Sequence, residues 1–136
     1  MLLVISAGIY VLIKPSGQNQ NTLSVPSADG SKNINVSNNF LNNPVEKTPS
    51  STLVANNPLY QVIYFGIDKS FLITLLSKPL KQGRADAEQA LLAKLNISQS
   101  QACNLKISVN VTNDVDQSLA GRELGLSFCA NATVLP

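Results

Sequence analysis

The two cysteines, Cys103 and Cys129, constrain the fold most, because a bond between them decides which segments lie side by side. Each adjoins a stretch of alternating apolar and polar residues, 105–111 after Cys103 and 124–128 before Cys129. Strict alternation predicts a strand with one buried and one wet face. Antiparallel pairing of these strands would bring the start of one next to the end of the other, as a disulfide requires. We therefore expect a structural Cys103–Cys129 disulfide.

Such a bond would close a loop of about 27 residues, for which the chain-entropy model gives roughly 3.5 kcal/mol of stabilisation. Two alternatives remain open: a pair of reduced core cysteines, and a redox pair or metal site. The second is disfavoured, because redox pairs usually take the form C-x-x-C. A zinc site needs four ligands, which this chain does not assemble without histidine.

The residues before the first cysteine predict a hairpin followed by a helix. Residues 59–65 and 71–76 are rich in β-branched, aromatic and aliphatic side chains, and a turn-like stretch, 66–70, separates them. From Arg84 to Leu95 strong helix formers dominate, with apolar residues four apart, so we expect an amphipathic helix. The order ββαββ predicts an α+β fold over residues 59–136, a small antiparallel sheet with the helix on one face.

The ends of this helix carry recognisable signals. Asp86 and Glu88 are expected in its first turn and Lys94 in its last, as the helix dipole favours. Asn96 stands where a left-handed terminating residue is expected. Ser98 begins a capping box that would start one further helical turn, ending near Cys103.

The first residues form a separate region, because 1–13 are apolar except for Ser6 and Gly8. A helix of thirteen residues covers about 20 Å, less than the roughly 30 Å hydrocarbon core of a bilayer. Residues 1–14 are therefore a signal-type segment, or the end of a membrane-spanning helix whose earlier residues are missing. No small-residue cleavage site follows, which favours an uncleaved membrane anchor. An even number of cysteines beyond such an anchor fits an oxidising compartment outside the cytoplasm.

Residues 15–58 are dominated by Asn, Ser, Pro, Thr, Gln and Gly. Ile34, Val36 and Phe40 are isolated apolar residues without a sustained period. This composition predicts a flexible linker that would hold the domain on the order of 35 Å from the anchor. The alternative is that residues 33–37 form an edge strand on the domain or on a partner.

Composition argues against several classes of function. Charged residues make up 13% of the chain and the net charge is +2, so we expect no nucleic-acid binding. The chain has no histidine, the commonest general base and neutral metal ligand. Asp114 and Asp116 lack the further ligands of an EF-hand and are expected in a solvated loop. Arg84, Asp86 and Glu88 are expected to form a charge cluster in the first helical turn, explained by the helix dipole and by pairing of residues four apart. We expect no catalytic site, no metal site and no cofactor.

Three stretches, 84–98, 102–109 and 120–129, resemble small single-pass proteins common in candidate-phylum (Patescibacteria) bacteria. The resemblance covers about sixty residues and depends on the spacing from the helix to Cys103 and on the ending Gly125-Leu-Ser-Phe-Cys129. It implies a membrane-anchored bacterial domain that faces outward and carries the same disulfide. It supplies no site residues.

Together these features favour a non-enzymatic binding or adaptor domain of the bacterial cell envelope. The N-terminal segment would hold it in the cell membrane as a single-pass protein, with the C-terminal domain outside the cytoplasm. Its partner would be another envelope protein or an envelope polymer, bound through the sheet face or an edge strand. A pilus-like or other structural subunit is the first alternative, although Pro15 would interrupt the continuous helix of a pilin. An envelope enzyme is the second.

Overall fold

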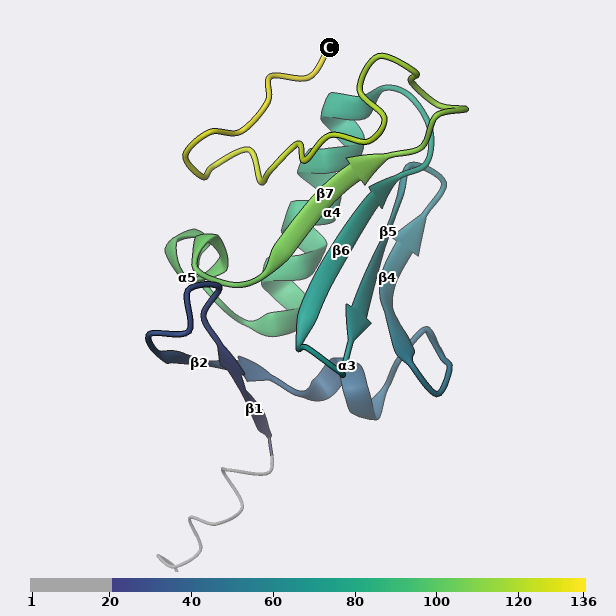
Figure 1. Cartoon of the computed structure of the whole chain (residues 1–136). Helices are drawn as coiled ribbons and strands as arrows, with labels where there is room; N and C mark the ends of the chain where they lie inside the picture. Colours follow the sequence, from purple (N-terminus) through teal and green to yellow (C-terminus); the bar gives the residue numbers. More distant parts are fainter. Residues whose placement is uncertain (1–20) are drawn as a thin grey trace, which may run out of the picture.

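The computed structural model describes residues 21–136 and is built around a five-stranded sheet with the strand order β3-β4-β5-β6-β7 (Figure 1). A second, two-stranded sheet, β1-β2, lies near the end of the molecule at which β6 and β7 begin. Helix α4 runs along one face of the large sheet. The elements are β1 (Thr22–Pro26), β2 (Asn33–Ser37), α3 (Asn39–Asn42), β3 (Glu46–Lys47), β4 (Ser51–Asn57), β5 (Tyr60–Phe65), β6 (Ser70–Leu75), α4 (Leu80–Leu95), α5 (Gln99–Cys103) and β7 (Ile107–Val111).

The large sheet is antiparallel from β3 to β6, whereas β6 and β7 are parallel. The prediction of a wholly antiparallel sheet is therefore wrong at this edge. The chain leaves β6 at one end, returns along α4 and enters β7 at the other end (Figure 1). Sixteen helical residues cover about 24 Å, enough to pass back over a strand of six residues, about 20 Å long. Strand β7 consequently points the same way as β6.

Buried side chains of the sheet lie on the face that α4 covers. In β5, Val62 and Tyr64 are buried and their neighbours in sequence are half-buried. On the helix, Ala87, Leu91 and Leu95 are fully buried, each four residues after the last. The amphipathic helix and the α+β fold with a helix on one face of the sheet are thus confirmed.

Helix α4 begins at Leu80, four residues before the expected Arg84. Its first turn therefore contains no acidic residue, and the predicted dipole role of Asp86 and Glu88 is wrong. The other end follows the prediction, because Asn96 has φ 54° and ψ 52°, in the left-handed region. The capping box before α5 also forms as expected.

Residues 21–58 are folded, so the predicted flexible linker is wrong for this part of the chain. Strands β1 and β2 pair in antiparallel register. Their inward side chains Val25, Ile34 and Val36 are buried in the hydrophobic core. The expected alternative strand at 33–37 is present, but it pairs with β1 and not with the large sheet.

Helix α3 explains how so polar a segment is held. Its Phe40 is buried, with its ring centroid 5.1 Å from that of Tyr64 and 5.9 Å from that of Phe71. Both contacts are edge-on, the arrangement that aromatic pairs favour. The expected anchor at residues 1–14 and the start of the expected linker lie outside the described residues. Within 21–136, no helix has the length and apolar character needed to cross a bilayer.

Residues 124–128 do not form the predicted final strand. Leu124 and Leu126 are buried, as their alternation predicted. Between them Gly125 has φ +78°, which a β-strand does not accommodate. The segment therefore follows an irregular path alongside β7, where the Leu124 N–H donates to the Val109 carbonyl at 2.9 Å.

Candidate functional site

The expected Cys103–Cys129 disulfide is present, with the two Cα atoms 5.6 Å apart. It joins the last residue of α5 to the irregular chain that follows β7, and not two paired strands. The alternatives of reduced cysteines and of a metal-binding pair are therefore excluded for these two residues. The bond fixes the midpoint of the C-terminal segment, residues 122–136, against the body of the domain.

Arg84 fixes the C-terminal segment on both sides of Cys129. Its side chain is buried, and its Nη1 donates hydrogen bonds to the carbonyl oxygens of Leu124 and Gly125, both at 3.3 Å, and of Thr133 at 2.8 Å. These carbonyls belong to an irregular chain that makes no regular ladder. The guanidinium thus replaces the missing strand partners.

Glu88, one turn further along α4, holds the same segment through its carboxylate oxygens, which accept hydrogen bonds. Its carboxylate accepts hydrogen bonds from the Ser127 N–H and from the Ser127 hydroxyl, the latter at 2.6 Å. The carboxylate also lies 4.0 Å from Nε of Arg84. The i,i+4 pairing expected for Arg84 and Glu88 is thus present, and both residues are buried, 5% and 4% exposed.

Opposite charges offset part of the cost of burying this pair. Burial lowers the pKa of Arg84, and the negative charge of Glu88 opposes that shift. The guanidinium remains charged because its pKa starts far above neutrality. The pair therefore acts as a fixed, charged clamp on the C-terminal segment, which we call the Arg84–Glu88 clamp.

Glu123 closes part of the outer edge of the large sheet. Its carboxylate accepts from the N–H of Val109 in β7 at 2.8 Å and from the N–H of Gly125 at 3.0 Å. An edge strand otherwise presents free backbone groups that can pair with another chain. The C-terminal segment thus shields the middle of β7 and forms a wall beside the sheet.

The face of the sheet opposite α4 carries an apolar row. The pairing register places Leu53 beside Ile63 and Ile63 beside Leu72, and Leu72 lies beside Ser108 of β7. Phe65 lies in the next row, opposite Ser70. The three aliphatic side chains and Phe65 are half-buried, and Ser108 is exposed.

Nothing among residues 21–136 covers this row with a helix or strand, as Figure 1 shows from its open side. We call it the uncovered face, defined by Leu53, Ile63, Phe65, Leu72 and Ser108. Its opposite surface is sealed by α4, so one sheet presents one buried and one accessible apolar surface. Accessible apolar surface bordered by polar residues is typical of interaction sites.

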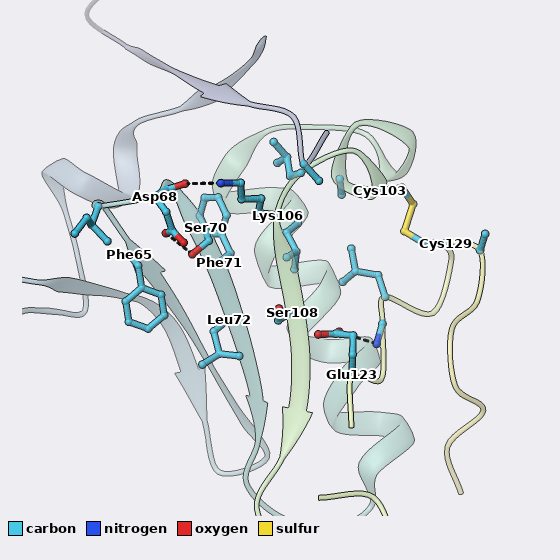
Figure 2. A pocket seen from close by; sticks show the side chains of 18 residues that line it. Phe65, Asp68, Ser70, Phe71, Leu72, Cys103, Lys106, Ser108, Glu123 and Cys129 are labelled. Atoms are coloured by element: carbon cyan, nitrogen blue, oxygen red, sulfur yellow. Dashed lines mark hydrogen bonds between the residues drawn. A yellow bond between two sulfur atoms is a disulfide. The ribbon is translucent and has the colours of Figure 1, made fainter. Parts of the chain in front are cut away.

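A groove of about 790 Å³ leads from the uncovered face past β7 to the disulfide (Figure 2). Phe65, Leu72 and Ser108 line its sheet side, while Glu123 and Cys129 line its opposite wall (Figure 2). The Arg84–Glu88 clamp therefore shapes the groove without lining it. Apolar contact with a few polar groups at the border suits recognition of another molecule.

The remaining sequence candidates form no site. Asp116 Oδ1 accepts hydrogen bonds from the N–H groups of Ser118 and Leu119 and from the Ser118 hydroxyl, so it stabilises its own loop. Of these three donors, the Ser118 hydroxyl lowers the Asp116 pKa most. No group of three or more metal-ligating side chains occurs within residues 21–136.

Only the helical spacing indicates the clamp in the sequence: Arg84 and Glu88 are four residues apart, on the same side of a helix as Ala87 and Leu91. Comparison of the chain with protein families, with curated proteins and with solved structures finds no match. The function is therefore argued from the site alone.

Proposed function

We propose that this chain is a membrane-tethered binding or adaptor domain of the bacterial cell envelope that works outside the cytoplasm. Residues 1–14 would anchor it, and the domain at 21–136 would bind another envelope protein. The observation that carries the binding role is the uncovered face with its adjoining groove. An apolar surface left accessible on an otherwise closed core suits a partner that covers it.

The disulfide supports the proposed location in an oxidising compartment outside the cytoplasm. Cys103 is exposed and Cys129 is half-buried, so both sulfurs are accessible to cellular reductants. Structural disulfides of this kind persist in oxidising compartments and are rare in the cytoplasm.

A binding role fits the chemistry of the groove better than catalysis does. The polar side chains at its border are those of Asp68, Ser70, Lys106, Ser108 and Glu123. Asp68 already accepts from the Ser70 hydroxyl at 2.6 Å, and Glu123 from two backbone N–H groups. Groups already engaged in this way favour a structural role, while the apolar floor favours contact with a partner.

A photo-crosslinking amino acid at Leu72 tests the proposal in cells of the source organism. Leu72 lies at the centre of the uncovered face, and a partner seated there would be captured as one discrete adduct with a different envelope protein. The matched control is the same amino acid at Ala85, an exposed position on the far side of α4.

The outcomes distinguish the classes of function. A discrete heterologous adduct at Leu72 that is absent at Ala85 supports the adaptor role. A ladder of self-adducts would instead indicate a pilus-like or other structural subunit. Equal adducts at both positions, or none at either, would contradict a protein-binding face.

A further inference from the structure

The folding of residues 21–58 brings the domain close to its proposed anchor. This inference rests on the proposed membrane anchor at residues 1–14. Between that anchor and strand β1 lie residues 15–21, seven residues that span at most about 25 Å when fully extended. The end of the domain at which β1 enters must therefore lie near the bilayer surface.

That end carries the most exposed large apolar side chain of residues 21–136. Ile67, in the turn between β5 and β6, is 96% exposed. The same turn contacts the entering strand directly, because Lys69 Nζ donates to the Ser24 carbonyl of β1 at 3.1 Å. An aliphatic side chain held out in a turn buries its surface by entering the interfacial region of a membrane.

Three lysines surround Ile67. Ile67 lines three adjoining hollows, and each contains one lysine: Lys47, Lys69 or Lys106. Lys106 Nζ is also held 3.5 Å from the Asp68 carbonyl, in the same turn (Figure 2). The carboxylates of Asp68 and Glu123 also line these hollows, so three lysines against two carboxylates leave a net charge of +1 around Ile67. We call Lys47, Ile67, Lys69 and Lys106 the basic turn.

The opposite end of the large sheet has a different character. It carries Asp114 and Asp116 in the loop after β7, together with the exposed Lys78 and Lys81. This end also carries an exposed apolar side chain, because Val134 is 90% exposed, close to the value for Ile67. Val134 belongs to the C-terminal residues beside the start of α4, where the Lys81 N–H donates to the Pro136 carbonyl. Exposure alone therefore does not distinguish the ends; position and lysine content do.

We propose that the basic turn docks on the anionic lipid headgroups of the membrane that holds the anchor. Lysines beside a membrane surface are attracted to anionic lipids, and the adjacent Ile67 supplies the apolar contact. The domain would then stand on the bilayer with β1 and the β5–β6 turn downward. The outer end of the sheet would face away from the membrane, and the uncovered face would stand upright and open to a partner.

Methyl NMR of the full chain in nanodiscs tests this orientation. The nanodiscs contain phosphatidylglycerol and phosphatidylcholine in equal parts, with a spin label on a fraction of the headgroups. We expect the spin label to broaden the Ile67 methyl resonances and to leave those of Val134 sharp. In Lys69→Gln/Lys106→Gln the Ile67 broadening should fall, because each lysine removed lowers the equilibrium constant for docking about fivefold. It should also fall in nanodiscs of phosphatidylcholine alone. The control Lys78→Gln/Lys81→Gln should change nothing.

The two proposals fail in different ways. If the full chain does not stay with phosphatidylglycerol vesicles after an alkaline wash, the anchor fails and the docking falls with it. If the chain stays but the Ile67 and Val134 resonances broaden equally, or Ile67 remains sharp, the anchor stands and the docking is overturned. Broadening that is insensitive to both lysines and to lipid charge would also overturn it.

Discussion

At the scale of single residues, the Arg84–Glu88 clamp determines the shape of the groove. The guanidinium supplies donors to three backbone carbonyls, and the carboxylate accepts from Ser127. Planar guanidinium geometry allows one side chain to reach several acceptors at once, which an ammonium group does less well. The irregular C-terminal segment is thus held by two side chains of α4 in place of a strand partner.

Replacing Arg84 by Met should therefore destabilise the domain strongly. The substitution removes the side-chain donor to the carbonyls of Gly125 and Thr133, while the Leu124 carbonyl keeps the Thr133 N–H. It also leaves Glu88 buried without its counter-charge, a loss of about 3–5 kcal/mol. Urea unfolding followed by circular dichroism measures the change. Lys81→Met, at an exposed position of the same helix, should change stability by less than about 0.5 kcal/mol. A loss below about 1 kcal/mol for Arg84→Met would contradict the clamp.

Asp29, in the turn between β1 and β2, predicts a dependence of stability on pH. Hydrogen bonds from the Ser31 N–H, the Ser27 hydroxyl and the Ser31 hydroxyl lower its pKa from 3.8 to about 2. Because the folded pKa lies below the unfolded value, the stabilisation is complete above about pH 5 and is lost as the pH falls towards 2.

Asp29→Asn should consequently weaken this dependence. We expect the urea midpoint of the variant to fall less than that of the native chain between about pH 5 and about pH 2. Asp68 and Asp116, whose pKa values are also lowered, leave a remaining dependence in the variant. Equal falls in both proteins would show that the Asp29 turn makes no contribution.

At the scale of elements, the periodicity of apolar residues predicted those helices and strands that bury one face. The hairpin β5–β6, helix α4 and strand β7 all follow regular apolar patterns and were predicted. Strands β1 and β2 were missed because together they bury only Val25, Ile34 and Val36, among mostly polar residues. Their packing into the shared hydrophobic core is a tertiary contact that no local pattern reveals.

The groove was the least predictable part of the molecule. Its wall depends on Arg84 reaching chain forty residues away, and sequence spacing within a helix does not indicate such a contact. Alternation predicted that Leu124 and Leu126 are buried, but Gly125 turns the chain out of a strand. The cysteine pair was predicted from antiparallel pairing of the segments beside it, and the disulfide is present although that strand pairing is not.

The disulfide closes α5, β7 and the C-terminal segment into one loop, so its removal acts on all three. Cys103→Ala/Cys129→Ala should lose about 3.5 kcal/mol of unfolding free energy, because the unfolded chain regains the freedom of that loop. Urea unfolding with and without reductant measures this loss. Reductant should destabilise the native chain by a similar amount and leave the variant unchanged. A variant as stable as the native chain would contradict a structural role.

At the scale of the whole molecule, three surfaces of the domain lie in different positions and would have different roles. The basic turn would face the proposed membrane, whereas α4 seals one side of the sheet and the uncovered face is open beside the groove. Instead of the distant display that a long linker would give, the domain would stand at the bilayer surface. Its partner would then have to reach the membrane, or be embedded in it.

The central claim is that the domain works in an oxidising compartment, around its closed disulfide. Acid quenching of cells to preserve the thiol state, followed by denaturation and labelling with a maleimide polymer with and without prior reduction, tests it most directly. We predict no mass shift without reduction and a shift by two polymers after reduction, since the chain has two cysteines. Addition of two polymers without any reductant would show free thiols, and would contradict both the compartment and the binding role built on it.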